Sequence, residues 1–323
     1  MTNQNILLNT KDGYLWSIGL TPNIFATMNF GGLPNKNQTY QSNKFRIKST
    51  ITSMSSNINY TFFTTSDGKL YFFISNDRYL SRQSLDALPN QFPKEISFKK
   101  SDFYIMVSTC DYFSAFIIKN KSTGKKNLFT TKFSKEGRNE INEKGEFIDA
   151  QMFEDEENPE REFIYVSTND TTGAAISKDG KLYTWGLNTK GECGHGNYDI
   201  IKTPKLVKFF DKNYFVTDVK CIQQAIIVIA KNLKNWKISL FCMGDNSQGR
   251  LGVSQQGNFE MKDTLPVPIL NPFFENKFPE KIFGGSKGVI VKCKVENIEE
   301  SRDNFNCSCQ DCGNLIRKKM GYN

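Results

Sequence analysis

Short apolar runs separated by polar turns are the main pattern of this chain. In three places, two runs that alternate hydrophobic and polar residues flank an Asp-Gly pair. Such a pair is a strong signal for a β-hairpin, because a type I′ turn needs positive φ at both central residues. The pattern predicts three hairpins: NTKDGYLWSIG around Asp12 and Gly13, TTSDGKLYFFI around Asp67 and Gly68, and ISKDGKLYTWG around Asp179 and Gly180.

The predicted hairpins recur with a period of 55 to 58 residues. The first two Asp-Gly turns are 55 residues apart, and the third follows after 112 residues, which is twice 56. Midway through that gap, two β-rich runs flank a polar turn at Thr123-Gly124. Downstream, FCMGDNSQGRLG (241–252) repeats TWGLNTKGECG (184–194) at an offset of 58. A sixth, ragged unit follows at 288–314, so the chain holds five clear units and one weak unit.

A repeat of this length with a central hairpin indicates a β-propeller. One unit cannot bury both faces of its strands alone, whereas radially stacked four-stranded blades bury them against each other. A linear β-solenoid is the alternative, but its repeats are usually much shorter. We therefore expect an all-β propeller over 1–300 and a ragged final repeat or Cys-rich tail at 301–323. The chain accommodates about six blades, with seven blades or an incompletely closed ring as alternatives.

The order strand, Asp-Gly, strand, then W-G-x-N-x-x-G-x-x-G-x-G and Pro resembles the repeat of the regulator of chromosome condensation family. Residues 172–207 carry this pattern well, 225–267 carry part of it, and 5–19 and 60–74 match it at the hairpin. The resemblance implies the seven-bladed propeller of that family. Besides the Asp-Gly pairs, the repeat signature comprises Trp185, Gly186, Asn188, Gly191 and Gly194, and further along the chain Gly244, Asn246, Gly249 and Gly252.

The glycine-rich stretch LYTWGLNTKGECGHG (182–196) could bind phosphate or simply shape a loop. A dinucleotide site would need a helix after its glycines, but no helical period follows Gly196 and Pro204 interrupts soon after. A Walker loop would need Gly-Lys-Ser/Thr, which this stretch lacks. The same spacing recurs at 244–252, so we interpret the glycines as positions of positive φ and close backbone approach. Asn188 is expected to bond its own downstream backbone in an Asx-type turn.

No reaction site stands out in the sequence. His195 is the single histidine, and its repeat counterpart is Val253, so a loop position fixed by the scaffold is preferred over a chemical role. The irregular C-terminal cysteines favour reduced thiols, with no metal and no cofactor. The alternative is a zinc site of four thiolates, from Cys293, Cys307, Cys309 and Cys312.

Composition and charge narrow the class of protein. The chain of 323 residues is 38% hydrophobic and 24% charged, which is globular, and its aromatic content of 13% favours strands. The longest apolar run, AIIVIA at 225–230, is too short to cross a bilayer, and no signal peptide is evident. The net charge is +8, but the lysines are scattered, so nucleic acid is not an expected partner. We expect a soluble intracellular protein, cytoplasmic or cytoskeletal or ciliary rather than nuclear.

The one dense charged run is EDEENPERE at 154–162. We interpret it as a solvated loop between blades, in which Pro159 breaks any strand. Its functional alternative is a loop that docks the basic surface of a partner.

Two functions remain open from the sequence. The first is a non-catalytic scaffold that docks other proteins through non-repeating loops, in a multi-subunit assembly. The second comes from the resemblance, since some members of that family catalyse nucleotide exchange on a small GTPase. No exchange residue of the family can be placed on this chain, so the scaffold is preferred.

Overall fold

The computed structural model describes residues 6–9, 14–19, 41–47, 49–57, 60–74, 94–96, 102–132, 150–253, 263–285 and 288–294. Within these ranges the chain is built almost entirely of β-strands, which form six antiparallel sheets in the order of the sequence. Asp12, Gly13, Cys307, Cys309, Cys312 and the predicted tail at 301–323 lie outside the described residues.

Each sheet is a meander in which neighbours along the chain pair with each other. The first sheet comprises β1 (Ile6–Asn9), β2 (Tyr14–Gly19) and β3 (Gln41–Arg46). The second comprises β4 (Ile51–Ser56), β5 (Tyr60–Thr65), β6 (Leu70–Ile74) and β7 (Lys94–Ile96). The third comprises β8 (Asp102–Thr109), β9 (Ser114–Asn120), β10 (Lys126–Thr130) and β11 (Gln151–Met152).

The next three sheets continue the same order. The fourth comprises β12 (Phe163–Asn169), β13 (Thr172–Ser177), β14 (Leu182–Gly186) and β15 (Ile201–Leu206). The fifth comprises β16 (Tyr214–Ile222), β17 (Ala225–Asn232), β18 (Ile238–Asp245) and β19 (Thr264–Leu270). The sixth pairs β20 (Phe278–Gly285) with β21 (Gly288–Lys294). Short helical turns lie in the connections: α2 (Lys208–Asp211), η2 (Ser247–Gly249) and η3 (Pro272–Phe274).

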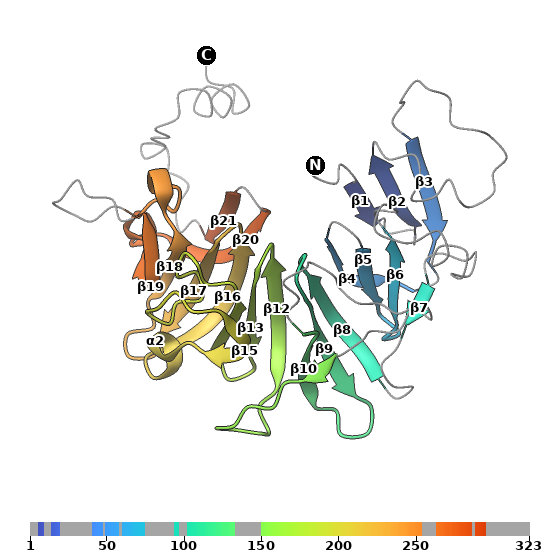
Figure 1. Ribbon diagram of the computed structural model, residues 1–323, viewed down its shortest axis with the longest axis horizontal. Coiled ribbons are helices and arrows are strands. Elements are labelled where there is room, and N and C mark those ends of the chain that lie inside the picture. Colours follow the sequence, from blue (N-terminus) through green and yellow to red (C-terminus); the bar gives the residue numbers. More distant parts are fainter. Residues whose placement is uncertain are drawn as a thin grey trace, which may run out of the picture.

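The sheets stand side by side in an arc (Figure 1). The sheet of β1 to β3 lies at one end of the arc and the pair β20–β21 at the other, and no described sheet joins strands from both ends. Consecutive four-stranded antiparallel sheets in this arrangement are the blades of a β-propeller. The predicted fold class is therefore confirmed, and closure of the ring is not seen within the described residues.

The first strands of neighbouring sheets are joined by a repeated hydrogen bond. The Ser55 hydroxyl in β4 accepts from the Thr109 N–H in β8 at 2.9 Å. The Ser167 hydroxyl in β12 likewise accepts from the Cys221 N–H in β16 at 3.1 Å. Both pairs are 54 residues apart. The sequence period thus reappears as a spatial repeat that pairs backbone N–H groups, which would be costly to bury unpaired.

A carboxylate takes over this role between the fifth and sixth sheets. Asp218 in β16 is 1% exposed, and its carboxylate accepts from the Ile282 N–H of β20 at 2.7 Å. The ammonium of Lys281 lies 3.0 Å from the same carboxylate and balances its charge. A buried carboxylate with both a charge partner and a backbone donor is stable in this setting.

Apolar side chains fill the spaces between successive sheets. Four clusters are seen in the described residues. Their principal members are Phe62, Phe72 and Phe116 between the second and third sheets, Phe113, Phe163 and Trp185 between the third and fourth, Val216, Val228 and Phe241 between the fourth and fifth, and Ile227, Leu265 and Ile282 between the fifth and sixth. Each sheet is therefore stable only with its neighbours, as expected of a repeat architecture.

The predicted hairpins appear at their places. Strands β5 and β6 flank the turn at 66–68, and β13 and β14 flank the turn at 178–180. The turn at Thr123-Gly124, expected from spacing alone, joins β9 to β10. Strands β1 and β2 pair with each other on either side of 10–13. Of the ragged sixth unit predicted at 288–314, the described part forms β21, which pairs with β20 just upstream of the predicted bounds.

Candidate functional site

The Asp-Gly turns support the sheet that follows them. Gly68 and Gly180 have φ values of 80° and 76°. A Cβ on Gly68 would lie 2.3 Å from the Phe103 ring, and one on Gly180 would lie 2.5 Å from the Phe215 ring. Because each phenylalanine starts the first strand of the next sheet, these glycines serve packing between blades.

The second part of the signature makes the same contacts in two successive sheets. Gly186 and Gly244 have φ values of 114° and 108°, and a Cβ on either would lie within 2.4 Å of a backbone carbonyl oxygen. Asn188 accepts from the Cys193 N–H at 2.8 Å and donates to the Asn197 carbonyl. Asn246 accepts from the Leu251 N–H in the same way.

The remaining signature residues also lie in the scaffold. Trp185 is buried and packs on Phe113 with ring centroids 5.7 Å apart. The N–H of Gly194 donates to the Gly191 carbonyl, and that of Gly252 donates to the Gly249 carbonyl. All four glycines have positive φ. The geometry places the signature residues in turns and blade contacts.

Within the described residues, His195 and Cys193 contact no side chain that would act with them as a catalytic pair. The Nε2 atom of His195 lies 3.0 Å from the Thr184 hydroxyl, and burial lowers the pKa of the imidazole to about 4. Cys193 is buried, and burial raises the pKa of its thiol well above its usual value. A thiol without thiolate character is a poor nucleophile. Cys293 is half-buried, and no cluster of three metal-ligating side chains occurs in the described parts of the chain.

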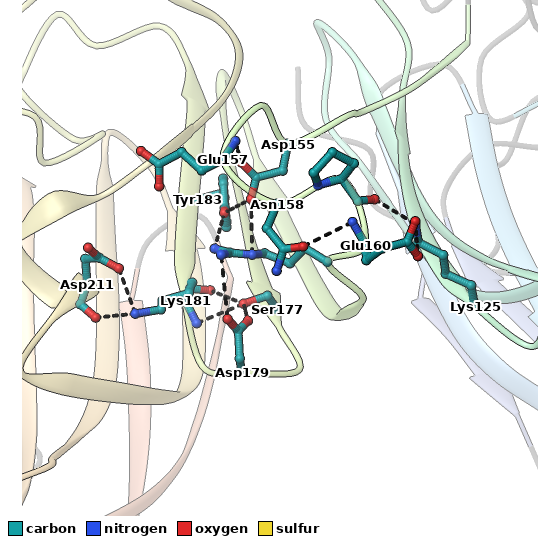
Figure 2. Close-up of polar contacts among 12 residues, drawn as sticks. Lys125, Asp155, Glu157, Asn158, Glu160, Ser177, Asp179, Lys181, Tyr183 and Asp211 are labelled. Atoms are coloured by element: carbon teal, nitrogen blue, oxygen red, sulfur yellow. Dashed lines mark hydrogen bonds and ion pairs between the residues drawn. The ribbon is translucent and has the colours of Figure 1, made fainter.

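The acidic run forms the loop between β11 and β12, as predicted, but its interior is not solvated. Asp155 is 8% exposed, and its carboxylate lies 3.1 Å from the Arg161 guanidinium. The Tyr183 hydroxyl of β14 donates to Asp155 at 2.5 Å and accepts from Arg161 at 2.6 Å. Figure 2 shows Tyr183 pointing toward Asp155. Asp155, Arg161 and Tyr183 thus form a buried polar core for 153–162.

The charges of this core reinforce one another. Burial raises the pKa of Tyr183, and the hydrogen bond to Asp155 raises it further, so the phenol stays protonated and can donate. Burial opposes the charge of Arg161, but Tyr183, Asp179 and Asp155 outweigh it and raise the pKa of the guanidinium. The Arg161 guanidinium also lies 3.7 Å from Asp179 in the Asp-Gly turn. The loop is therefore tied to the repeat signature beneath it.

A second set of contacts fixes the outer part of the loop. The ammonium of Lys125 donates to the Pro159 carbonyl at 2.7 Å and contacts the Glu160 carboxylate at 3.1 Å (Figure 2). The side chains of Asp155 and Asn158 each accept from the N–H two residues further on, which closes two Asx turns. Four glutamates remain on the surface: Glu154, Glu156, Glu157 and Glu160. The loop is a fixed acidic surface on a rigid base.

Sequence reasoning identified the acidic run but missed what holds it. Asp155 is one carboxylate among several in 154–162, and no local signal distinguishes it as the buried one. Tyr183 and Lys125 come from other strands and turns, so only the fold brings them to the loop. The sole local hint is Arg161, the only basic residue within the acidic run.

The model of the regulator of chromosome condensation (RCC1) repeat matches residues 179–224. Residues 179–224 are therefore similar to an RCC1 repeat. Among curated relatives, the RCC2 homologue of Xenopus laevis is 28% identical over 119 residues, and human RCC2 is 26% identical over the same length. Each match covers 37% of this chain and 21% of the relative. The human ubiquitin ligase HERC2 is 32% identical over 91 residues, 28% of this chain and 2% of that protein.

Solved structures agree with an RCC1-type propeller. Human WBSCR16 superposes with a TM-score of 0.62 at 14% identity, covering 90% of this chain and 70% of that one. Yeast RCC1 (Prp20), solved bound to Kap60, superposes with a TM-score of 0.59 at 12% identity. The superposition covers 99% of this chain and 68% of that one. At these identities the likeness concerns the fold. Among the described residues, no helix has the length and apolar character needed to span a membrane.

Proposed function

We propose that this RCC1-repeat protein is a non-catalytic propeller subunit that docks protein partners through its non-repeating loops, as part of a larger assembly. One observation carries the proposal. The signature residues lie in turns and blade contacts, whereas the 153–162 loop, fixed by its buried polar core, presents four glutamates to the surface. A fixed surface loop of uniform charge suits recognition, because little conformational freedom is lost on binding.

The partner of this loop is expected to be a basic protein surface. Opposite charges steer encounter and select against wrong partners. Prp20p from Saccharomyces cerevisiae, which shares the fold, is described by its binding properties to Gsp1p and histones. That protein sets a precedent for protein docking by an RCC1 propeller. A cytoplasmic, cytoskeletal or ciliary site stays a prediction from sequence.

The test compares the protein with the triple variant Glu154→Gln, Glu156→Gln, Glu157→Gln, purified under native conditions from the same cells. The three side chains are exposed and make no side-chain hydrogen bond seen among the described residues, so the buried core remains. Asp199→Asn, an exposed change in another loop, is the control. Partners absent from the triple variant but retained by the control support docking at this loop. Identical partners for all three proteins would reject it.

Nucleotide exchange on a small GTPase is the second candidate. It is favoured by the RCC1 repeat and by a rigid loop of the kind that could be inserted into a nucleotide site. The protein would be incubated with a panel of small GTPases loaded with labelled GDP. Accelerated release that the triple variant lacks would support exchange through this loop. Unchanged release across the panel would leave the scaffold as the function.

A further inference from the structure

Two hairpin turns of this chain share one hydrogen-bond pattern. In the β9–β10 turn, the Asn120 side-chain oxygen accepts from the N–H groups two and three residues on, at 2.8 and 3.1 Å. In the β17–β18 turn, the Asn232 side chain does the same at 2.8 and 3.3 Å. The fifth residue then donates its N–H to the asparagine carbonyl, Gly124 at 2.8 Å and Trp236 at 2.9 Å. The two turns are therefore a matched pair.

The two turns differ in the identity of their fifth residue, whose backbone is left-handed in both. Gly124 has a φ of 76° and Trp236 a φ of 63°. Glycine adopts this region freely, whereas a bulky side chain there is a genuine outlier. Packing within the protein does not explain the tryptophan, because Trp236 is 64% exposed. An outlier kept at the surface is a reason to look for a binding role.

A second exposed aromatic residue lies in the neighbouring connection. Phe273, in the turn η3 between β19 and β20, is 60% exposed. Each ring carries an ammonium group over its face: Lys231 lies 4.1 Å from the Trp236 centroid and Lys277 lies 3.3 Å from the Phe273 centroid. The ion pair between Lys237 and Glu275, 3.4 Å long, joins the two connections. We call the surface of Trp236 and Phe273 with their two lysines the aromatic patch.

The charge of this surface points to an acidic partner. Lys231 and Lys277 lie over the two rings, and Lys234 and Lys237 flank Trp236 in the sequence. Glu275 is the carboxylate that the described contacts place beside them, paired with Lys237. Exposed tryptophan is the residue type most often found at the energetic centre of protein interfaces. Lysines around it would pair with carboxylates at the rim of such a contact.

The surroundings favour a protein segment over a membrane or nucleic acid. Backbone hydrogen bonds connect the acidic loop, through the turns of the fourth and fifth sheets, to the turn that carries Trp236: Lys178 N–H to Glu162, Val216 N–H to Gly180, and Leu233 N–H to Asn213. An extended anionic surface that reaches along these turns would also meet the glutamates of 154–160. A short acidic segment can occupy the aromatic patch without meeting them.

We propose that the aromatic patch binds an acidic protein segment that packs apolar side chains against Trp236 and Phe273. The proposal rests on the proposed docking function but uses a surface distinct from the acidic loop. Binding transfers apolar side-chain area of both rings out of water, and the lysines pair with the carboxylates of the segment.

The test uses a short synthetic peptide of alternating glutamate and leucine, labelled with fluorescein. We expect it to bind the protein and to bind Trp236→Gly and Phe273→Ser each about thirtyfold more weakly. Trp236→Gly reproduces the turn at 120–125, so its thermal midpoint should be unchanged or higher. A peptide with lysine in place of glutamate should not bind. Absence of binding to the wild-type protein, or equal binding by Trp236→Gly, would overturn the proposal.

Two further arms separate the alternatives. Phosphatidylserine vesicles and polyuridylate are titrated in parallel, and Trp236-dependent binding of either without binding of the peptide would also overturn the proposal. The acidic-loop triple variant should bind the peptide like the wild-type protein. A failure of docking at the acidic loop would therefore leave this result unchanged.

Discussion

The loop after β14 and the loop before β12 show two ways of using a connection in one propeller. The first, at 187–196, follows the repeat, and its glycines and Asn188 make the contacts that recur at 245–253. The second, at 153–162, has no counterpart among the described connections, and its shape depends on Arg161 and Tyr183. Residues that recur serve the scaffold, and residues that do not recur are free to form a surface. Residue types that suggest chemistry in the sequence, such as Cys193 and His195, therefore belong to the repeating scaffold in this chain.

The largest expected effect is at Gly186, the last residue of β14, where the repeating loop begins. Gly186→Ala places a Cβ 2.1 Å from the Thr171 carbonyl oxygen at a φ of 114°, so it should lower the free energy of unfolding by about 4 kcal/mol. Gly124→Ala is the control, because its φ is also positive but its Cβ would meet only Lys119 at 3.9 Å. Gly124→Ala should lower the free energy of unfolding, measured with urea, by about 1 kcal/mol. An equal loss of unfolding free energy in the two variants would refute the close approach of Gly186 to the Thr171 carbonyl oxygen.

The non-repeating loop should be nearly as sensitive at its base. Arg161→Met leaves the buried carboxylate of Asp155 without its cation, and should cost about 3 kcal/mol at pH 7. The double variant Arg161→Met, Asp155→Asn removes both charges and should recover part of the loss. A double variant no better than the single one would show that the two side chains do not act as a pair.

A pH-dependent effect distinguishes Glu192 in the repeating loop. This carboxylate is fully buried, with one oxygen accepting from the Lys190 N–H and the other without a partner among the described residues. Burial raises its pKa from 4.5 to about 7. Because the pKa in the folded state lies above that of the unfolded state, this contribution to stability is complete below pH 4.5 and is lost as the pH rises through 7.

Glu192→Gln should therefore stabilise the protein at pH 8 by about 2 kcal/mol and have little effect at pH 4.5. Urea unfolding across that range measures the difference between the two proteins. The titration of His195 occurs in both and cancels from the comparison. A gain that does not change with pH would assign the effect to packing instead of charge.

How far the sequence predicts this molecule depends on whether a feature is periodic. The Asp-Gly pairs and the W-G-x-N signature repeat, so their spacing predicted the hairpins, the propeller and the turn at Thr123-Gly124. The buried core of 153–162 joins side chains from distant strands, and no spacing rule reaches Tyr183 from Asp155. The left-handed backbone at Trp236 depends on the hydrogen bonds of Asn232, which no repeat spacing predicts.

The smallest expected effect on stability belongs to the change that tests the proposed docking function. Glu154→Gln, Glu156→Gln and Glu157→Gln together should alter the free energy of unfolding by no more than about 0.5 kcal/mol, since the three side chains are exposed. Urea unfolding of the triple variant checks this expectation. A larger loss would mean that the glutamates belong to the scaffold.

The most direct test of the central claim is the comparison of proteins that co-purify with the wild-type chain and with this triple variant. The account predicts that at least one partner bearing a basic surface is lost from the variant and retained by Asp199→Asn. Retention of every partner by a correctly folded triple variant would contradict docking through the 153–162 loop.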